Sequence, residues 1–158
     1  MSFLKLGHNE NGEIIHIKEL RKEHARILKK ADYFKKSLSR KGLVSEKSIN
    51  MFERGICDII KWEEDFLFPQ LKDYMPEDGH IFVMTYTHDK IKTELINLRN
   101  ALFNQESFEI RKAAEKLVKA LRYHIEKEDE VVLSEAEKNI KQSQIGYLSS
   151  MFAKMTRD

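Results

Sequence analysis

The chain has 158 residues, of which 41% are hydrophobic and 34% charged, with 6 glycines and 2 prolines. This composition is too apolar for a disordered chain and too poor in turn residues for a fold of many short strands. The 28 Lys and Arg residues are interspersed with the 26 Asp and Glu residues, so there is no basic stripe of the kind that binds nucleic acid. The sequence therefore predicts one domain of long helices.

The cellular compartment is indicated by what the sequence lacks. Cys57 is the single cysteine, which excludes an intramolecular disulfide. Residues 1–12 lack the apolar stretch of a secretory signal, and no apolar run approaches the length that spans a membrane. We therefore expect a cytoplasmic protein without membrane insertion.

The first half of the chain contains two helical patterns. After an N-terminal arm at residues 1–13, the first helix is expected at roughly 14–38. The second is expected at roughly 46–73, with Ser45 as its N-cap. Residues 75–79, Met-Pro-Glu-Asp-Gly, then predict a clear break.

The second half repeats this organisation. The third helix follows the break and continues to about residue 103. Ser107 is expected to cap the fourth helix, with Glu109 in its first turn facing the helix dipole. The fourth helix continues to about residue 139. Residues 141–158 form an amphipathic tail that is expected to contain a fifth, shorter helix.

Four helices of roughly 25–30 residues joined by short loops are typical of an up-down-up-down bundle. We therefore predict an all-α protein, an antiparallel four-helix bundle over residues 14–140 with a short C-terminal helix. The apolar stripe of the tail is expected to pack against its own bundle or against a second subunit, in a possible homodimer. Its residues are Tyr147, Leu148, Met151, Phe152 and Met155, with Lys154 and Arg157 beside them.

Each predicted helix carries one inward-facing row of residues, spaced alternately by three and four. The first two rows are Ile17, Leu20, His24, Ile27, Ala31, Phe34, Leu38 and Ile49, Phe52, Ile56, Ile59, Glu63, Phe66. The other two rows are Ile81, Met84, His88, Ile91, Leu95, Leu98, Leu102 and Ile110, Ala114, Leu117, Leu121, His124, Glu128, Val131.

Every row is interrupted by a polar side chain where an apolar one is expected. These side chains are His24, Glu63, His88, His124 and Glu128. From the helical rise, each lies about 12–23 Å from the same end of an antiparallel bundle. Burying an unpaired carboxylate costs several kcal/mol. Two carboxylates facing three imidazoles are therefore explained by a positive ion between them.

The residue types suggest the ion. Neutral imidazole together with carboxylate suits iron, manganese or zinc, and two carboxylates in a bundle core suggest a dinuclear site. His124 and Glu128 are four residues apart and can reach one centre. A single buried histidine is more often a hydrogen-bonded core residue, but five polar residues on four rows at one level favour the metal. His8, His16 and His80 fall off the rows and are expected at the surface, and Cys57 is expected to be a small packing residue.

The same residues carry a resemblance to the hemerythrin-like, or HHE cation-binding, domains. Glu23-His24 followed by Ile27-Leu28 resembles the motif of their opening helix, and Trp62 to Pro69 resembles their acidic stretch ending in Leu-Phe-Pro. Thr87-His88-Asp89 and His124 to Val131 resemble the third- and fourth-helix motifs. The match covers about residues 14–138. It implies two non-haem irons bridged by two carboxylates, with roles in reversible O₂ binding, iron or redox sensing, or iron handling.

Carried over by position, the resemblance assigns His88 and His124 to one iron and His24 to the other, with Glu63 and Glu128 as bridges. The family usually has a histidine four residues before the second-helix glutamate, where this chain has Ile59. The second third-helix histidine of oxygen carriers would fall at Met84. We therefore expect the second iron to bind more weakly, to take water in place of nitrogen, or to be absent.

Three functions follow from these observations. The first is a non-haem iron protein that binds or senses O₂, NO or peroxide, or handles iron. The second is a di-iron enzyme, an oxidase or peroxidase, that uses open metal positions. The third is a metal-poor bundle that acts as a partner-binding module through its tail. Metal content separates the third from the others, and spectra with and without O₂ or peroxide separate the first two.

Overall fold

The structure, a computed structural model, describes residues 17–39, 46–76 and 78–155, and every element in these ranges is helical. The predicted all-α class is therefore confirmed. The long helices are α1 (Ile17–Ser39), α2 (Glu46–Trp62), α4 (His80–Asn104) and α5 (Ser107–Lys127). The shorter elements are η1 (Glu63–Leu67), α3 (Phe68–Gln70), η2 (Glu128–Val132), α6 (Leu133–Asn139) and α7 (Gln142–Met155).

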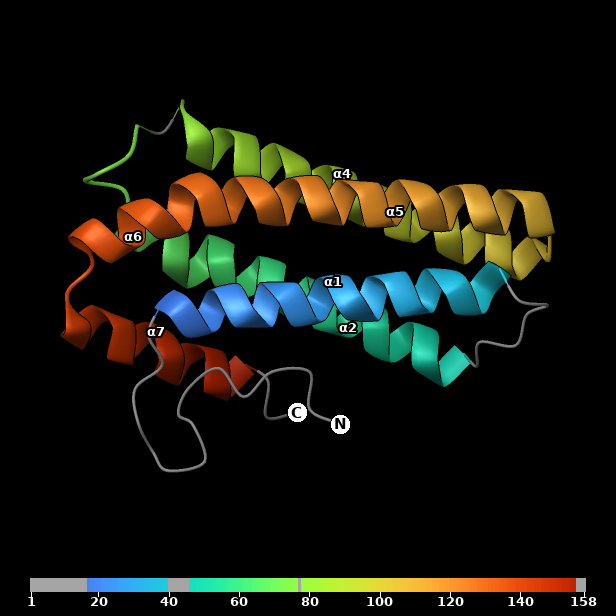
Figure 1. Cartoon of the computed structure of the whole chain (residues 1–158), viewed down its shortest axis with the longest axis horizontal. Helices are drawn as coiled ribbons and strands as arrows, with labels where there is room; N and C mark the ends of the chain where they lie inside the picture. Colours follow the sequence, from blue (N-terminus) through green and yellow to red (C-terminus); the bar gives the residue numbers. More distant parts are fainter. Residues whose placement is uncertain (1–16, 40–45, 77, 156–158) are drawn as a thin grey trace.

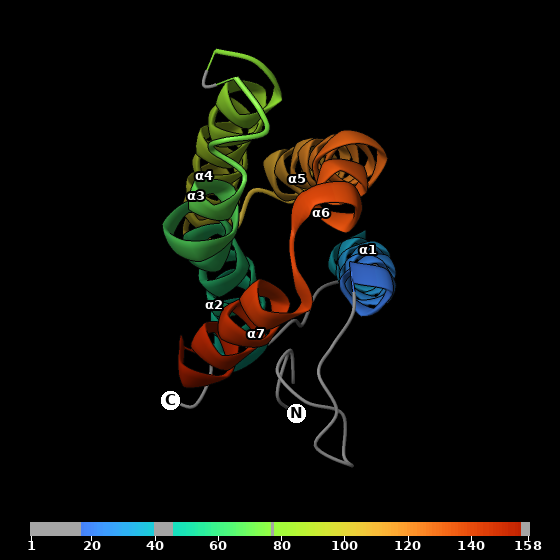
Figure 2. The ribbon, with the colours of Figure 1, turned by 90° about the vertical axis from the view of Figure 1, so that its left-hand side faces the viewer.

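The long helices form a bundle. They lie along the long axis of the molecule in Figure 1. In the end view of Figure 2, α5 lies between α4 and α1, and α7 lies beside α2. None of the helices in the described ranges combines the length and apolar character needed to cross a bilayer.

The core of the bundle consists of two apolar clusters. One includes Phe34, Phe52 and Leu117, and extends towards the turn between α4 and α5. The other includes Leu67 and Leu133, and extends towards α6 and α7. The buried polar side chains interrupt the core near the place where one cluster gives way to the other. The bundle therefore holds this polar layer between two apolar regions.

The connection between α4 and α5 is a tight turn. Gln105 has the left-handed conformation (φ 55°), and its backbone N–H donates to the carbonyl oxygens of Ala101 and Leu102. Glu106, not Ser107, occupies the N-cap position of α5, and no side-chain hydrogen bond caps the helix. The predicted cap at Ser107 is therefore wrong, because the helix already begins at that residue. The predicted cap at Ser45 and residues 14–16 of the first predicted helix lie outside the described residues.

The second and fourth predicted helices are each interrupted by a π turn. In η1 the backbone N–H of Phe68 donates to the carbonyl of Glu63, and in η2 that of Leu133 donates to Glu128. Each π turn contains one residue more than an α turn. The residues that face the core after the turn are therefore shifted by one position in the sequence. Leu67 and Val132 are consequently fully buried, while the predicted Phe66 and Val131 are only partly buried. The second helix also ends at Gln70, before the predicted residue 73.

The C-terminal tail packs against its own chain. Leu148 of α7 is buried in the same apolar cluster as Leu67 and Leu133, whereas Tyr147 is half exposed. The side chains of Phe152 and Met155 and all of Arg157 lie outside the described residues. The tail therefore closes the α2 and η1 side of the bundle.

Candidate metal centre

The structure brings together all five polar residues that interrupt the predicted rows. His24 comes from α1, His88 from α4 and His124 from α5, while Glu63 and Glu128 are the first residues of η1 and η2. All five are buried, and the exposed fraction of His88 and of Glu128 is 0%. Both π turns thus begin at a buried glutamate of this centre, in keeping with the frequent occurrence of π turns at functional sites.

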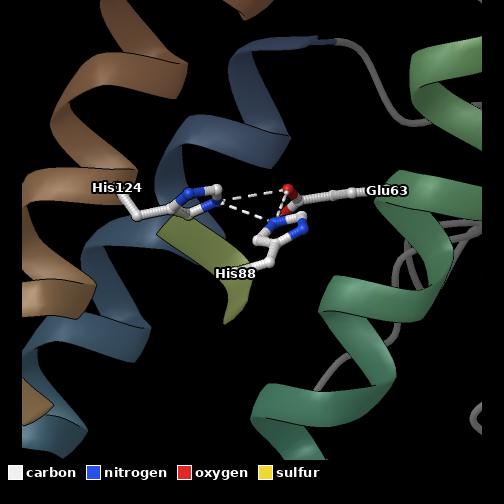
Figure 3. Close-up of side chains that lie close together, drawn as sticks. All are labelled: Glu63, His88 and His124. Atoms are coloured by element: carbon white, nitrogen blue, oxygen red, sulfur yellow. Dashed lines mark hydrogen bonds and ion pairs between the residues drawn. The ribbon is translucent and has the colours of Figure 1, made fainter. Parts of the chain in front are cut away.

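Glu63, His88 and His124 form the first ligand group, in which the three side chains point toward one another (Figure 3). Glu63 Oε2 lies 3.1 Å from His88 Nε2 and 3.3 Å from His124 Nε2. The two Nε2 atoms are 3.2 Å apart. One carboxylate oxygen and two imidazole nitrogens therefore converge on one point.

His24, Glu63 and Glu128 form the second ligand group. Glu128 Oε2 lies 3.6 Å from His24 Nε2 and 3.2 Å from His124 Nε2. Neither approach has hydrogen-bond geometry, so both Glu128 carboxylate oxygens are buried without a hydrogen-bond partner. A buried carboxylate in this state is strongly disfavoured unless a cation accompanies it. The residues present therefore fit a bound metal ion.

Glu63 belongs to both ligand groups. In each group one ligand atom per residue lies within 4.8 Å of the others. A carboxylate shared between two such groups can offer one oxygen to each of two ions. The two candidate ligand groups are therefore joined through Glu63.

The outer nitrogen of each imidazole is held by a neighbour. His88 Nδ1 lies 2.7 Å from Glu64 Oε1, His24 Nδ1 2.6 Å from Asp129 Oδ1, and His124 Nδ1 2.6 Å from Thr87 Oγ1. The sequence pattern assigned no such role to Glu64, Asp129 and Thr87. Each is adjacent in the chain to a predicted ligand, which is the signal that could have revealed them.

These contacts determine which nitrogen of each ring faces the centre. The Thr87 hydroxyl donates its hydrogen to the Met84 carbonyl, so it can only accept from His124 Nδ1–H. The carboxylates of Glu64 and Asp129 likewise accept from the Nδ1–H groups of His88 and His24. All three Nε2 lone pairs are thereby directed toward Glu63 and Glu128. Such outer-shell anchoring is typical of metal-ligating histidines.

The carboxylates make the centre attract positive charge. Burial lowers the pKa of His124, but the carboxylates of Glu128 and Glu63 outweigh it and raise this pKa to about 10. Burial also lowers the pKa of His24, and Glu128 and Asp129 outweigh it, so this pKa is raised too. Burial and the charge of Glu63 raise the pKa of Glu128. Without a metal, the imidazoles of His124 and His24 therefore hold protons in its place.

The remaining residues singled out from the sequence lie outside this centre. Ile59 is buried one turn before Glu63, and Met84 is buried one turn before His88, so both positions are apolar. His80 is exposed, as predicted, and Cys57 is partly buried against the apolar core. His8 and His16 lie outside the described residues.

A cavity of about 20 Å³ adjoins the centre. It is lined by His24, Glu63 and His124 and by seven apolar side chains, Ile27, Ile56, Ile59, Ile60, Ile91, Leu121 and Ile125. This volume has room for about one water-sized molecule. The centre therefore opens, on the side of Ile59, to a small apolar space.

A comparison with protein-family models agrees with the composition of this centre. Searches of curated proteins and of solved structures gave no significant match. A family model described as the hemerythrin HHE cation binding domain matches residues 15–136. This range covers most of the chain and contains all five buried polar residues. The chain therefore belongs to the hemerythrin HHE cation-binding domain family.

Proposed function

We propose that this protein binds two iron ions through His24, Glu63, His88, His124 and Glu128, and uses them to bind or sense O₂, NO or peroxide, or to handle iron. The observation that carries the proposal is the Glu128 carboxylate, which is fully buried without a hydrogen-bond partner beside His24 and His124. The proposal takes the four long helices as an antiparallel up-down-up-down bundle, which brings these residues to one level.

The ligands divide unequally between the two positions. His88 and His124 supply two nitrogens to one position, whereas His24 supplies a single nitrogen to the other. Glu63 and Glu128 reach toward both sides. Imidazole and carboxylate ligands suit iron, although manganese and zinc accept similar ligands. When bound, iron supplies redox chemistry and exchangeable coordination positions.

The apolar cavity suggests the kind of ligand. Ile59 stands where the family usually has a histidine, and its side chain lines the cavity beside His24 and Glu63. A space of about 20 Å³ favours a diatomic molecule or peroxide over a larger organic substrate. The metal position at His24 thus has one nitrogen ligand fewer than the family pattern, and an apolar cavity lies beside it.

Iron content tests the proposal most directly. Protein loaded with Fe(II) without air is expected to retain up to two ions per chain, with the second one weaker. O₂, NO or peroxide should then change its absorption spectrum. A spectrum that returns when the ligand is removed supports binding or sensing, and one that returns only after turnover supports an oxidase or peroxidase. Failure to retain iron, manganese or zinc would overturn the proposal.

A further inference from the structure

Helix α7 contacts the chain around Glu63 at three successive points. The Trp62 indole Nε1–H donates to the Leu148 carbonyl at 2.9 Å. The Phe66 and Tyr147 rings meet edge to face with centroids 6.4 Å apart. Gln144 Nε2 donates to Gln70 Oε1 at 3.1 Å. Positions 62, 66 and 70 are four apart, so the two helices meet along one continuous stripe.

This stripe covers both ends of the π turn. Trp62 precedes η1, Phe66 lies within it and Gln70 follows it. A π turn holds an extra residue and is less favourable than continued α helix, so it needs contacts that support its register. Contacts with α7 on both sides of the turn fix how the segment before the turn is rotated relative to the segment after it. Glu63 is the first residue of the turn, and its carboxylate faces His88 and His124.

The Trp62 contact lies next to the candidate ligand. Trp62 is the only tryptophan of the chain and is buried at 3% exposure. A buried indole N–H requires an acceptor, and the Leu148 carbonyl supplies one. Neighbouring residues of a helix point about 100° apart. The indole can therefore face α7 while the Glu63 carboxylate faces the centre.

Helix α7 lies beyond the part of the chain that matches the family. The match ends at residue 136, whereas α7 spans Gln142–Met155. One partner in each contact between α7 and η1 therefore lies outside the matched range. A helix that binds the segment carrying a shared ligand can influence both ligand groups at once, because Glu63 belongs to both.

We infer that Trp62 is a positioning residue and that α7, by accepting its indole N–H, holds Glu63 in register for metal binding. This inference rests on the proposed function. Release of α7 relaxes the π turn, turns the Glu63 carboxylate away from His88 and His124, and weakens iron at both positions. His24 and His124 keep their own anchors at Asp129 and Thr87, whereas the Glu64 anchor of His88 lies in η1 and moves with the turn.

Two variants of the full chain test the inference from opposite sides of the contact. Trp62→Phe keeps a buried aromatic ring and removes the indole donor. Gly146→Pro leaves Trp62 intact and breaks α7 two residues before Leu148. Lys154→Ala is the matched control, because Lys154 is exposed on the same helix. Fe(II) titration without air gives the dissociation constants, and circular dichroism of the metal-free proteins gives helix content and melting temperature.

Both test variants are expected to retain most of the helix content and to bind iron about tenfold more weakly or worse. Lys154→Ala should match the parent. In Gly146→Pro the Trp62 fluorescence should move to longer wavelength as water reaches the indole. A purely structural role would instead lower the metal-free melting temperature and leave the dissociation constants unchanged.

The possible outcomes separate this inference from the proposed function. Parental iron affinity in Trp62→Phe, or in Gly146→Pro with shifted Trp62 fluorescence, overturns the inference and leaves the proposed function standing. Failure of the parent itself to bind iron overturns both. Weaker binding in both folded variants, with parental binding in Lys154→Ala, supports the inference.

Discussion

The imidazoles of His88 and His124 face each other with their Nε2 atoms 3.2 Å apart. Their Nδ1 atoms are occupied by Glu64 and Thr87, so both inner nitrogens present lone pairs. Two lone pairs at this distance repel each other unless a proton or a metal ion lies between them. The fold therefore holds these rings in an arrangement that is favourable only with a cation.

Removal of metal should accordingly destabilise the protein. Iron that binds only the native state adds about 2.7 kcal/mol at 100 times its dissociation constant. For a chain of this size the melting temperature should rise by roughly 5–10 °C on loading. Calorimetry of metal-free and iron-loaded protein measures this shift, with His80→Ala as a surface control. Equal melting temperatures under verified loading would contradict the assignment.

Replacement of Glu128 should separate stability from metal binding. Glu128→Gln removes a buried carboxylate that has no hydrogen-bond partner and lies close to the charge of Glu63. The metal-free variant loses the attraction of Glu128 to the protonated His24 and His124, but it also loses the burial cost of the carboxylate and its repulsion by Glu63, so its stability should differ from that of the parent by about 1 kcal/mol or less. Its iron affinity should fall at least tenfold.

Glu130→Gln provides the control for Glu128→Gln, because the Glu130 side chain is exposed. Melting temperature and iron titration of the three proteins are measured together. A large loss of metal-free stability in Glu128→Gln alone would indicate that the carboxylate has a structural role instead.

The stability of the metal-free protein should fall as pH rises above neutrality. The folded pKa of His124 is raised to about 10 from an ordinary value of 6.5. A raised pKa stabilises the fold fully below the unfolded value, and this contribution is lost as pH rises toward 10. The raised pKa values of His24 and Glu128 act in the same direction.

Melting temperatures between pH 6 and 10 test this dependence. His124→Gln should show a flatter profile, and so should iron-loaded protein, in which the metal replaces the protons. A metal-free parent whose melting temperature rises over this range would contradict the prediction.

The Thr87 hydroxyl should contribute to metal affinity without touching the metal. Thr87→Val has nearly the same shape but leaves His124 Nδ1–H without its acceptor. Loss of such an anchor typically costs 10–100-fold in metal affinity. Thr85→Val is the matched control, since its exposed hydroxyl donates only to the Ile81 carbonyl. Similar iron affinity in both variants would show that the anchor has no effect.

Ile59 should account for the weakness of the second iron. Ile59→His adds a nitrogen one turn before Glu63, beside the cavity that adjoins His24. The metal-free variant should be less stable, because the change removes a buried aliphatic side chain worth roughly 1.5–3 kcal/mol. With iron present, coordination should offset this loss and bring the content closer to two ions per chain.

Iron titration of parent and Ile59→His side by side measures the second site. Two tightly bound irons in the parent, with no change in the variant, would mean that another residue completes the centre. Glu64 would then be the first to examine, because it follows Glu63 directly and already contacts His88.

The helical period of the sequence was sufficient to predict the all-helical class and to single out His24, Glu63, His88, His124 and Glu128. The reason is that a polar residue in an apolar row of helical spacing stands out from the sequence pattern alone. The same period failed at Phe66 and Val131, because a π turn inserts one residue without a change in composition. Nothing in the local sequence pattern indicates that an extra residue is present at these turns.

Only the tertiary structure determined how these side chains are held. Glu64, Asp129 and Thr87 lie beside the rows, and their partners lie on other helices 24, 105 and 37 residues away in sequence. The Trp62 indole likewise finds its acceptor 86 residues away in α7. Hydrogen bonds of this kind depend on the distance between two elements after packing. A pattern within one helix therefore identifies the inward residues, whereas the orientation of each ring is decided when the helices come together.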